Sequence, residues 1–340
     1  MKFLPVSPES LKEGAEIILN GGLVSFPTET VYGLGADAFN PKALAKVFEV
    51  KNRPHFDPLI IHIAAIETLE RAADLSLLND ETRKTLFLLA ENLWPGPLSI
   101  ILPKNEKIPG IATSGLPTAA IRYPAHKAAC KLITLSSGAV AAPSANPFGG
   151  LSPTRAEHVR SALGEKVDMI LDGGPSQIGV ESTVIDITGE TIKILRPGGT
   201  PKEKIENLIG RAVDSSVSFE DTAGMISPGQ LKSHYAPKAA LCVLSREEII
   251  RQPYEKGKAA YLFFDSTTKD AWLKANKEPE TAVVKALSEN GTVLEAASRL
   301  FETLHELDNS DIDKIFAQLA PQEGLGEAIN DRLRRGANSR

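Results

Sequence analysis

The chain has little cysteine. Its only two, Cys130 and Cys242, lie far apart in a sequence of 340 residues, each inside an apolar run. Such cysteines usually behave as small buried apolar side chains. A disulfide framework or a structural zinc site would need more Cys or His at metal-binding spacing, so both classes are excluded.

Long apolar runs and an excess of positive charge are also missing. No stretch of about 18 apolar residues occurs, and the first ten residues, MKFLPVSPES, lack the apolar core of a signal peptide. We therefore predict a cytoplasmic protein that does not bind membranes. The net charge of -5 argues against a broad basic surface, so direct binding of tRNA is expected to be weak or absent.

The common nucleotide and catalytic motifs do not occur. The sequence contains no G-x-x-x-x-G-K-[ST] and no G-x-G-x-x-G after a strand. H-E-x-x-H, C-x-x-C and G-x-S-x-G are absent as well. If the chain handles a nucleotide, it must use a less common kind of site.

Alternating strand and helix patterns predict a two-domain α/β protein. A chain of 340 residues exceeds what one hydrophobic core usually organises. Apolar runs such as LIIHI at 59–63 and LSIIL at 98–102 are typical of buried strands, with helical segments between them. We predict a mixed or mostly parallel sheet in residues 1–211. A linker or lid rich in Ser, Gly and Pro then spans 212–238, and a smaller Rossmann-like α/β domain spans 239–340.

Two segments of the first half place polar residues where ligands bind. FPTETVYGLGAD, at 26–37, brings Thr and Glu to the carboxyl end of a strand, although a simple polar turn explains it as well. In KNRPHFDPLIIHI, at 51–63, Lys51 and Arg53 flank a Pro-stiffened loop and suit phosphates, but they also suit a helix C-terminus. His62 interrupts an apolar strand, as either a ligand contact or a core residue.

Three further segments add loops of similar character. They are APSANPFGGLSPTRAEH at 142–158, LDGGPSQIGVESTVID at 171–186 and ILRPGG at 194–199. The tetrapeptide TRAE predicts a capping box and a helix start. Arg122 and Arg196 each end a strand beside a proline. Turn chemistry explains each segment singly, whereas together they indicate one site for an anionic ligand, built from several loops.

These segments resemble the YrdC-type threonylcarbamoyl-AMP synthases. The strings FPTETVYGLGA, KNRPHFDPLIIHI, WPGPLSIIL, APSAN, LSPTRAEHV, ILDGGPSQIGVESTVID and ILRPGG follow one another in the family's order. SHYAPKA and GLGEAINDRLRRGA, further along, are similar to the long, two-domain form. The resemblance implies an open, twisted mixed sheet with helices and a basic concave cavity, followed by a smaller Rossmann-like domain. It implies an ATP-using nucleotidyltransferase.

The resemblance also implies a reaction and its ligands. L-Threonine, bicarbonate and ATP would give L-threonylcarbamoyladenylate, pyrophosphate and water. A partner threonylcarbamoyl-transferase complex would then use the product on adenosine 37 of tRNAs that read ANN codons. Mg²⁺ would accompany ATP, and no tightly bound organic cofactor is expected.

Site residues follow from the resemblance, position by position. The implied threonine contacts are Thr30, His62, Arg122, Ser182 and the backbone of Ala142. The implied ATP contacts are Lys51, Arg53, Asp57, Thr118, Ser144, Asn146, Ser152, Arg196 and Tyr235. Lys51 and Arg53 are the predicted catalytic residues, because the transfer needs positioning and charge neutralisation rather than a covalent nucleophile.

Two departures and two alternatives accompany the resemblance. Asp57 stands where many members carry Asn, and Pro147-Phe148 stands where members often have a basic or small polar residue. The fold also occurs within hydrogenase-maturation carbamoyltransferases, but this chain lacks their acylphosphatase-like and zinc-finger modules. An RNA-binding module is the other alternative, and the acidic net charge argues against it.

Overall fold

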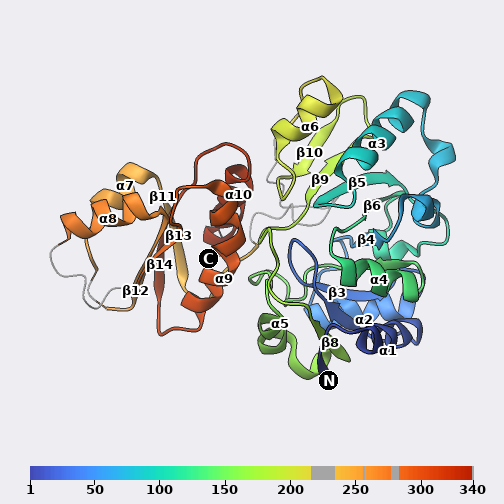
Figure 1. Cartoon of the computed structure of the whole chain (residues 1–340), viewed down its shortest axis with the longest axis horizontal. Helices are drawn as coiled ribbons and strands as arrows, with labels where there is room; N and C mark the ends of the chain where they lie inside the picture. Colours follow the sequence, from blue (N-terminus) through green and yellow to red (C-terminus); the bar gives the residue numbers. More distant parts are fainter. Residues whose placement is uncertain (216–233, 256, 277–282, 339–340) are drawn as a thin grey trace. The chain divides into compact units, whose positions relative to one another are not determined.

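The computed structural model describes residues 1–215, 234–255, 257–276 and 283–338. It divides into two compact units (Figure 1). The first comprises Met1–Phe148, Ser152–Gln177 and Glu181–Gln230; the second comprises Gly149–Leu151, Ile178–Val180 and Leu231–Arg340. Most of the predicted linker, including Ser233, lies outside the described residues.

The first unit is built on a mixed sheet of ten strands. Their order is β1-β8-β2-β3-β7-β4-β6-β5-β9-β10. The strands are β1 (Lys2–Pro5), β2 (Val24–Phe26), β3 (Gly33–Asp37), β4 (Ile60–Ile63), β5 (Leu98–Pro103), β6 (Thr118–Arg122), β7 (Ala139–Ala141), β8 (Met169–Asp172), β9 (Thr183–Asp186) and β10 (Lys193–Arg196). The predicted α/β class with a mixed sheet is confirmed.

Four of the six α-helices described in the first unit, the first four along the chain, begin at a side-chain cap. The six are α1 (Pro8–Leu19), α2 (Pro41–Lys51), α3 (Asp80–Leu93), α4 (Lys127–Leu135), α5 (Ala156–Leu163) and α6 (Lys202–Ile209). The Asn40 side chain accepts from the backbone N–H groups of Lys42 and Ala43, and Asn52 ends α2 in the left-handed region at φ 50°. This ending turns the chain sharply after Lys51.

The predicted capping box at TRAE is wrong. Helix α5 begins only after Arg155, and no side chain caps it. The backbone N–H of Thr154 lies 3.3 Å from Nδ1 of His158, so Thr154 is engaged as a donor to a side chain within the helix instead of as its N-cap.

The central strands have one apolar face and one mixed face. Ile61, Ile100 and Ile121 belong to the main hydrophobic core. Alternate residues of the same strands point to the opposite face, where Ile60 and Ile101 form part of a smaller apolar cluster. The main core lies on one face, whereas α1 and α4 pack on the other face near β2, β7 and β8, beside the polar side chains of the central strands.

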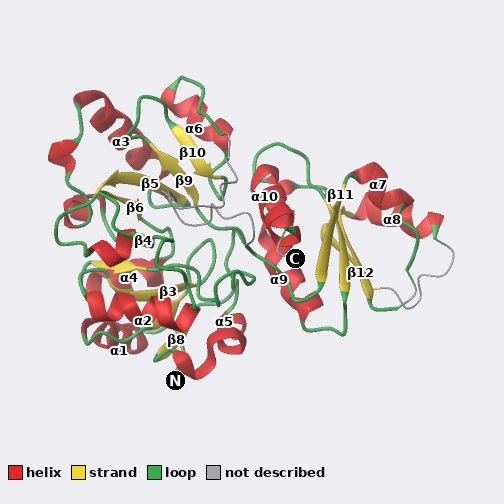
Figure 2. Cartoon of the chain, turned by 180° about the vertical axis from the view of Figure 1, so that it is seen from behind, coloured by secondary structure: helices red, strands yellow, loops and turns green. Residues whose placement is uncertain are grey.

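The second unit is a parallel sheet between two pairs of helices. Strands β11 (Ala240–Leu244), β12 (Ala259–Asp265), β13 (Val283–Ser288) and β14 (Lys314–Gln318) run in the order β11-β14-β12-β13, all parallel. Helix α7 (Arg246–Arg251) contacts α8 (Ser266–Ala275), and α9 (Val293–Asp308) contacts α10 (Gly326–Ala337). The two pairs lie on opposite faces of the sheet (Figure 2), as in Rossmann-like folds.

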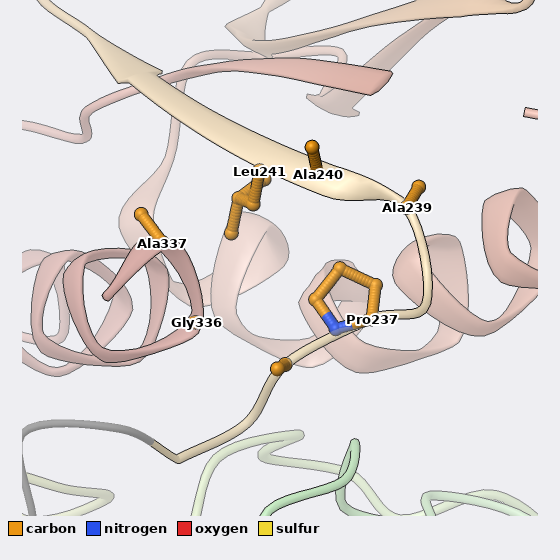
Figure 3. Close-up of a pocket in the computed structure, with 7 residues that line it drawn as sticks. Pro237, Ala239, Ala240, Leu241, Gly336 and Ala337 are labelled. Carbon is orange, nitrogen blue, oxygen red and sulfur yellow. The ribbon is translucent and has the colours of Figure 1, made fainter. Parts of the chain in front are cut away.

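A small cavity opens where the chain enters the second unit (Figure 3). It has a volume of about 260 Å³ and lies between the start of β11 and the end of α10. Ala239, Leu241 and Ala337 are among the residues that line it, and its lining side chains are all apolar. None of the described helices is both long enough and apolar enough to cross a membrane.

Candidate active site

A row of polar side chains crosses the mixed face of the first sheet. His62 of β4 pairs with Arg122 of β6, and Arg122 pairs with Ser99 of β5. Ser99 pairs with Val184 of β9, which in turn pairs with Arg196 of β10. Because directly opposed residues share a face and neighbouring strands lie about 4.8 Å apart, these five positions form one line. Residues far apart in the sequence thereby become neighbours.

Arg122 is held inside this row. Its Nη2 donates to Oε1 of Glu29 at 2.6 Å, and its Nε donates to the carbonyl oxygen of Gly96 at 3.3 Å. Both partners of the ion pair are almost completely buried. Burying a charge is unfavourable unless it is paired, and this ion pair gives each buried group its partner.

His62 is a buried, neutral imidazole. Burial, with the Arg122 cation as the second cause, lowers the pKa of His62 to about 3. Its Nδ1 lies 3.2 Å from the carbonyl oxygen of Ile60. A carbonyl can only accept, so Nδ1 donates here when it carries the ring proton. The ring also meets Phe26 edge-on, with centroids 6.5 Å apart.

The turn after β2 orients two threonine hydroxyls. Oγ1 of Thr28 lies 2.9 Å from Oγ1 of Thr30 and donates to the carbonyl oxygen of Val31 at 2.6 Å. Thr30 is fully buried. Because the Val31 carbonyl takes the Thr28 proton, Thr30 donates to Thr28 when those two hydroxyls bond.

Lys51 joins the end of α2 to the loop after β7. Its Nζ donates to the carbonyl oxygens of Ser144, at 2.6 Å, and Asn146. Its own carbonyl oxygen accepts from the N–H of Phe148 at 2.7 Å. Burial lowers the pKa of Lys51 well below its usual value, and the Arg53 cation adds to this effect. The ammonium group therefore lies where a further negative charge would stabilise it.

Arg53 braces the turn that follows the helix. It donates to the carbonyl oxygens of Asp57 at 2.9 Å and Pro58 at 2.8 Å, and its Nη2 lies 2.8 Å from Oδ1 of Asp57. Burial raises the pKa of Asp57, whereas Arg53, Lys51 and Arg196 oppose the rise. Arg196, on the far strand β10, is thus close enough to act on this carboxyl group.

Ser182 connects β5, β9 and β10. Its Oγ lies 2.8 Å from Oγ of Ser99, and Nη2 of Arg196 lies 2.8 Å from its carbonyl oxygen and 3.1 Å from its Oγ. The preceding residue, Glu181, accepts a short hydrogen bond from Ser152 and raises the pKa of Lys51. The loops that contain Ser152 and Ser182 are therefore linked to the cations Lys51 and Arg196.

Most of the predicted site residues belong to this connected cluster. Hydrogen bonds, strand register and electrostatic coupling link most of them to it through Arg122 and its neighbours: Lys51, Arg53, Asp57, His62, Ala142, Ser144, Asn146, Ser152, Ser182 and Arg196. Thr30 follows Glu29 in the sequence and bonds to Thr28. Ala142 enters through its N–H, which donates to the carbonyl oxygen of Ile60 at 2.9 Å. Thr118 lies apart, at the opposite end of β6 from Arg122.

Tyr235 belongs to the second unit. Its ring lies 4.9 Å from the Arg332 guanidinium and packs against Phe301 and His234. Its backbone is left-handed, at φ 63°, and its side chain is buried. The contact between Tyr235 and ATP stays a prediction.

Sequence reasoning missed three residues of the cluster: Glu29, Ser99 and Glu181. Glu29 and Glu181 stood inside two of the segments singled out, TET and VEST, but nothing in either string shows which carboxylate faces an arginine. Ser99 interrupts the apolar strand LSIIL, just as His62 interrupts LIIHI. A single polar residue inside each of several apolar strands was the pattern from which Ser99 could have been predicted as a site residue.

Within the described residues, no group of three or more His, Cys, Asp or Glu side chains could hold a metal ion. The cluster does contain two carboxylates, Asp57 and Glu181, near its cations. Mg²⁺ is usually held by one or two carboxylates together with substrate phosphates. The arrangement suits an ion that arrives with a nucleotide.

The ten-stranded sheet, the line of polar side chains across it and the second unit define the class of protein. It is a two-domain α/β protein whose site contains cations and hydroxyl groups. The family model described as "Telomere recombination" matches residues 16–198, and "Threonylcarbamoyl-AMP synthase, C-terminal domain" matches residues 200–338. The chain belongs to the threonylcarbamoyl-AMP synthase family.

Relatives cover nearly the whole chain. The threonylcarbamoyl-AMP synthase of Pyrococcus abyssi is 41% identical over 97% of this chain and 94% of its own length. That of Bacillus subtilis is 40% identical over 99% of this chain and 95% of its own. The crystal structure of P. abyssi Sua5 complexed with L-threonine superposes with a TM-score of 0.86 at 40% identity, covering 100% of this chain and 97% of that one.

Proposed function

We propose that the chain is a nucleotidyltransferase that converts L-threonine, bicarbonate and ATP into L-threonylcarbamoyladenylate, pyrophosphate and water. The observation that carries the proposal is the connected cluster. His62, Arg122 and Ser99 lie in one line across the sheet, Ser182 bonds Ser99 and Arg196, and electrostatic coupling through Asp57 joins Arg196 to Lys51 and Arg53. It combines Arg122 and a set of neutral donors and acceptors on one side with three further cations, Lys51, Arg53 and Arg196, on the other. Family membership supports the same conclusion.

The threonine half of the site is formed around Arg122. Its guanidinium would bind the substrate carboxylate, the usual partner of an arginine fork. Thr30, Ser182 and neutral His62 would bind the substrate hydroxyl and amine, with the backbone of Ala142 beside them. A neutral imidazole matters here because a second cation would repel the ammonium form of threonine.

The ATP half is formed by Lys51, Arg53 and Arg196. Lys51 now donates to two loop carbonyls, so the phosphates would compete with the carbonyls of Ser144 and Asn146 for it. Asp57 pairs with Arg53, and Ser152 bonds Glu181 near Lys51. Thr118 would contact the nucleotide further along β6. Tyr235 would close over the nucleotide. Mg²⁺ would enter with ATP, near Asp57 and Glu181, and no organic cofactor is required.

The chemistry then needs alignment rather than a covalent intermediate. The threonine amine forms a C–N bond to bicarbonate and water leaves, giving a carbamate. A carbamate oxygen attacks the α-phosphorus, and the bond to the β-phosphate oxygen breaks to release pyrophosphate. Lys51 and Arg53 stabilise the charge that develops on the phosphates, while the cluster excludes water from a hydrolysable product.

The product would be passed to a threonylcarbamoyl-transferase complex that acts on adenosine 37 of tRNAs reading ANN codons, in the cytoplasm. We propose the domain division 1–211, 212–238 and 239–340, with the middle segment as a lid over the site. Direct binding of tRNA would be weak or absent.

The deciding experiment is a pyrophosphate-release assay with the full-length chain. Release should require L-threonine, bicarbonate and ATP together, and should fall when L-serine replaces L-threonine. Release without amino acid or bicarbonate would contradict the proposal. Filter binding with tRNA is the complementary measurement: tight, salt-sensitive binding without pyrophosphate release would favour the RNA-binding alternative, and carbamoyl phosphate turnover would favour the carbamoyl-transfer one.

A further inference from the structure

The second unit contains a cavity at the carboxyl edge of its parallel sheet. The cavity has a volume of about 520 Å³, within the range of small-molecule sites. All four strand ends contribute to it: Arg246 follows β11, Asp265 ends β12, Gly291 follows β13 and Gln318 ends β14. None of these residues belongs to the site proposed above.

The topology makes this edge a natural place for a ligand. Strands β14 and β12 are neighbours, but β14 leads into α10 and β12 leads into α8. These helices lie on opposite faces of the sheet (Figure 2). Where neighbouring strands lead to opposite faces, a crevice opens beyond their carboxyl ends, and open α/β sheets bind ligands in it.

Gln318, at the end of β14, lines this cavity. The residue is 3% exposed, and its Oε1 accepts from the backbone N–H of Phe264 at 2.9 Å. A backbone N–H can only donate, so this bond fixes the amide oxygen there and leaves Nε2 as the other end. Within the described residues Nε2 has no protein acceptor. Nε2 is not among the fully buried atoms that lack a partner, so it stays accessible and a ligand oxygen can accept from it in place of water.

Arg246 supplies a cation at the same cavity. Its Nε donates to Oγ1 of Thr268 at 3.2 Å, which orients the guanidinium and leaves both Nη groups for other acceptors. No described carboxylate lies within ion-pair distance of it. Asp265 also lines the cavity, and its carboxylate accepts from the backbone N–H of Thr268 at 2.7 Å and from its Oγ1 at 3.1 Å.

We propose that this cavity is a second ligand site, for a nucleotide-sized molecule whose phosphate or carboxylate group binds Arg246 and Gln318 Nε2. Both groups are donors, so the ligand must present acceptor oxygens. An arginine fork favours a planar carboxylate or a phosphate. The cavity volume accommodates a mononucleotide, whereas inorganic phosphate alone would fill little of it.

Calorimetric titration of the full-length chain tests the proposal, with AMP, adenosine, inorganic phosphate and succinate as separate probes. AMP or succinate should bind in an event that Arg246→Gln and Gln318→Glu each weaken about tenfold or more, a loss of about 1.4 kcal/mol or more. Gln318→Glu keeps the oxygen that Phe264 needs and replaces only the donor. Binding of AMP without adenosine identifies the phosphate as the recognised group, and binding of succinate alone identifies the carboxylate.

Two controls separate this site from the first. Arg251→Gln changes an exposed arginine at the other end of α7 and should leave every titration unchanged. Pyrophosphate release should stay normal in Arg246→Gln, so a failure here and a failure of the proposed activity are distinguishable. If the probes bind Arg246→Gln and Gln318→Glu as tightly as the unaltered chain, the second site does not exist. The same holds if Lys51→Met, which alters the first site, removes all binding of the probes.

Discussion

The guanidinium of Arg122 and the carboxylate of Glu29 are 2.6 Å apart in an ion pair whose side chains are 5% and 7% exposed. Oε2 of Glu29 is buried and has no hydrogen-bond partner among the described residues. A carboxylate with one oxygen on an arginine and the other unused can receive a second donor, such as the amine of threonine. The pair thus presents both charges that an amino acid needs.

Glu29→Gln should weaken the use of threonine. The amide keeps the volume but loses the charge that orients Arg122 and receives the amine. A hydrogen bond to a charged group contributes about 1.5–3 kcal/mol, so kcat/KM for threonine should fall roughly 10- to 150-fold. Pyrophosphate release measured against threonine concentration checks this. Glu165→Gln, at an exposed ion pair with the N-terminus, is the matched control, and an unchanged kcat/KM in Glu29→Gln would remove Glu29 from the site.

Lys51→Met should remove pyrophosphate release while the chain stays folded. Methionine fills the buried space of the lysine stem, but the carbonyls of Ser144 and Asn146 lose their donor, so urea unfolding of the variant is measured beside its turnover. The loss of one charge-stabilising donor should lower kcat about 100- to 1,000-fold. Lys42→Met, on the exposed side of the same helix, should behave normally. Near-normal turnover in Lys51→Met would show that Lys51 serves only to hold the loop of Ser144.

Protonation of His62 should make acid unfolding steeper. Its pKa in the folded chain is about 3, below the unfolded value near 6.5, so the unfolded chain binds the proton first and stability falls as pH drops from 6.5 toward 3. Between about pH 7.5 and pH 5.5 this one group costs about 1.4 kcal/mol. His62→Gln should remove that share of the pH dependence in urea unfolding, whereas the exposed His55→Gln should not. An unaltered pH dependence in His62→Gln would contradict the buried, neutral imidazole.

Gly198→Ala should disturb the first unit at the Arg196 turn. A Cβ at residue 198 would lie 2.4 Å from the backbone of Glu181, Ser182 and Thr183, which cannot move aside cheaply. We expect a loss of about 1–3 kcal/mol of unfolding free energy, together with lower pyrophosphate release, because Ser182 shifts. Gly189→Ala, whose Cβ would meet nothing closer than 3.7 Å, is the control. Unchanged stability in Gly198→Ala would mean that this turn relaxes freely.

Truncation after residue 215 should lower pyrophosphate release or increase hydrolysis of the adenylate. The cut keeps Val213, which is buried, and Asp214, whose backbone pairs with Ile192 and Ile194. It removes Tyr235 and the second unit. Full activity and full product retention in the shortened chain would rule out the lid.

The sequence predicted the strands and the residues at their ends better than it predicted which side chains contact one another. Apolar runs such as LIIHI identified the central strands, and Asn40-Pro41 identified the start of α2, because short-range patterns control both. Helix α8 was missed: its buried Trp272 stands among polar residues, and only Asp265 as N-cap marks its start. The pairing of Glu29 with Arg122 depends on strand order, which no local pattern contains.

The alternation along β4, β5 and β6 has a consequence for how the protein tolerates change. His62, Arg122 and Ser99 each adjoin an isoleucine, at 61, 121 and 100, that faces the main core. A slip of one residue in any of these strands would place the polar group in the main apolar core and the isoleucine among the polar side chains of the site. A chain with the wrong strand register is therefore less stable even without a substrate. Folding to the correct register also brings the site residues together, with no separate step.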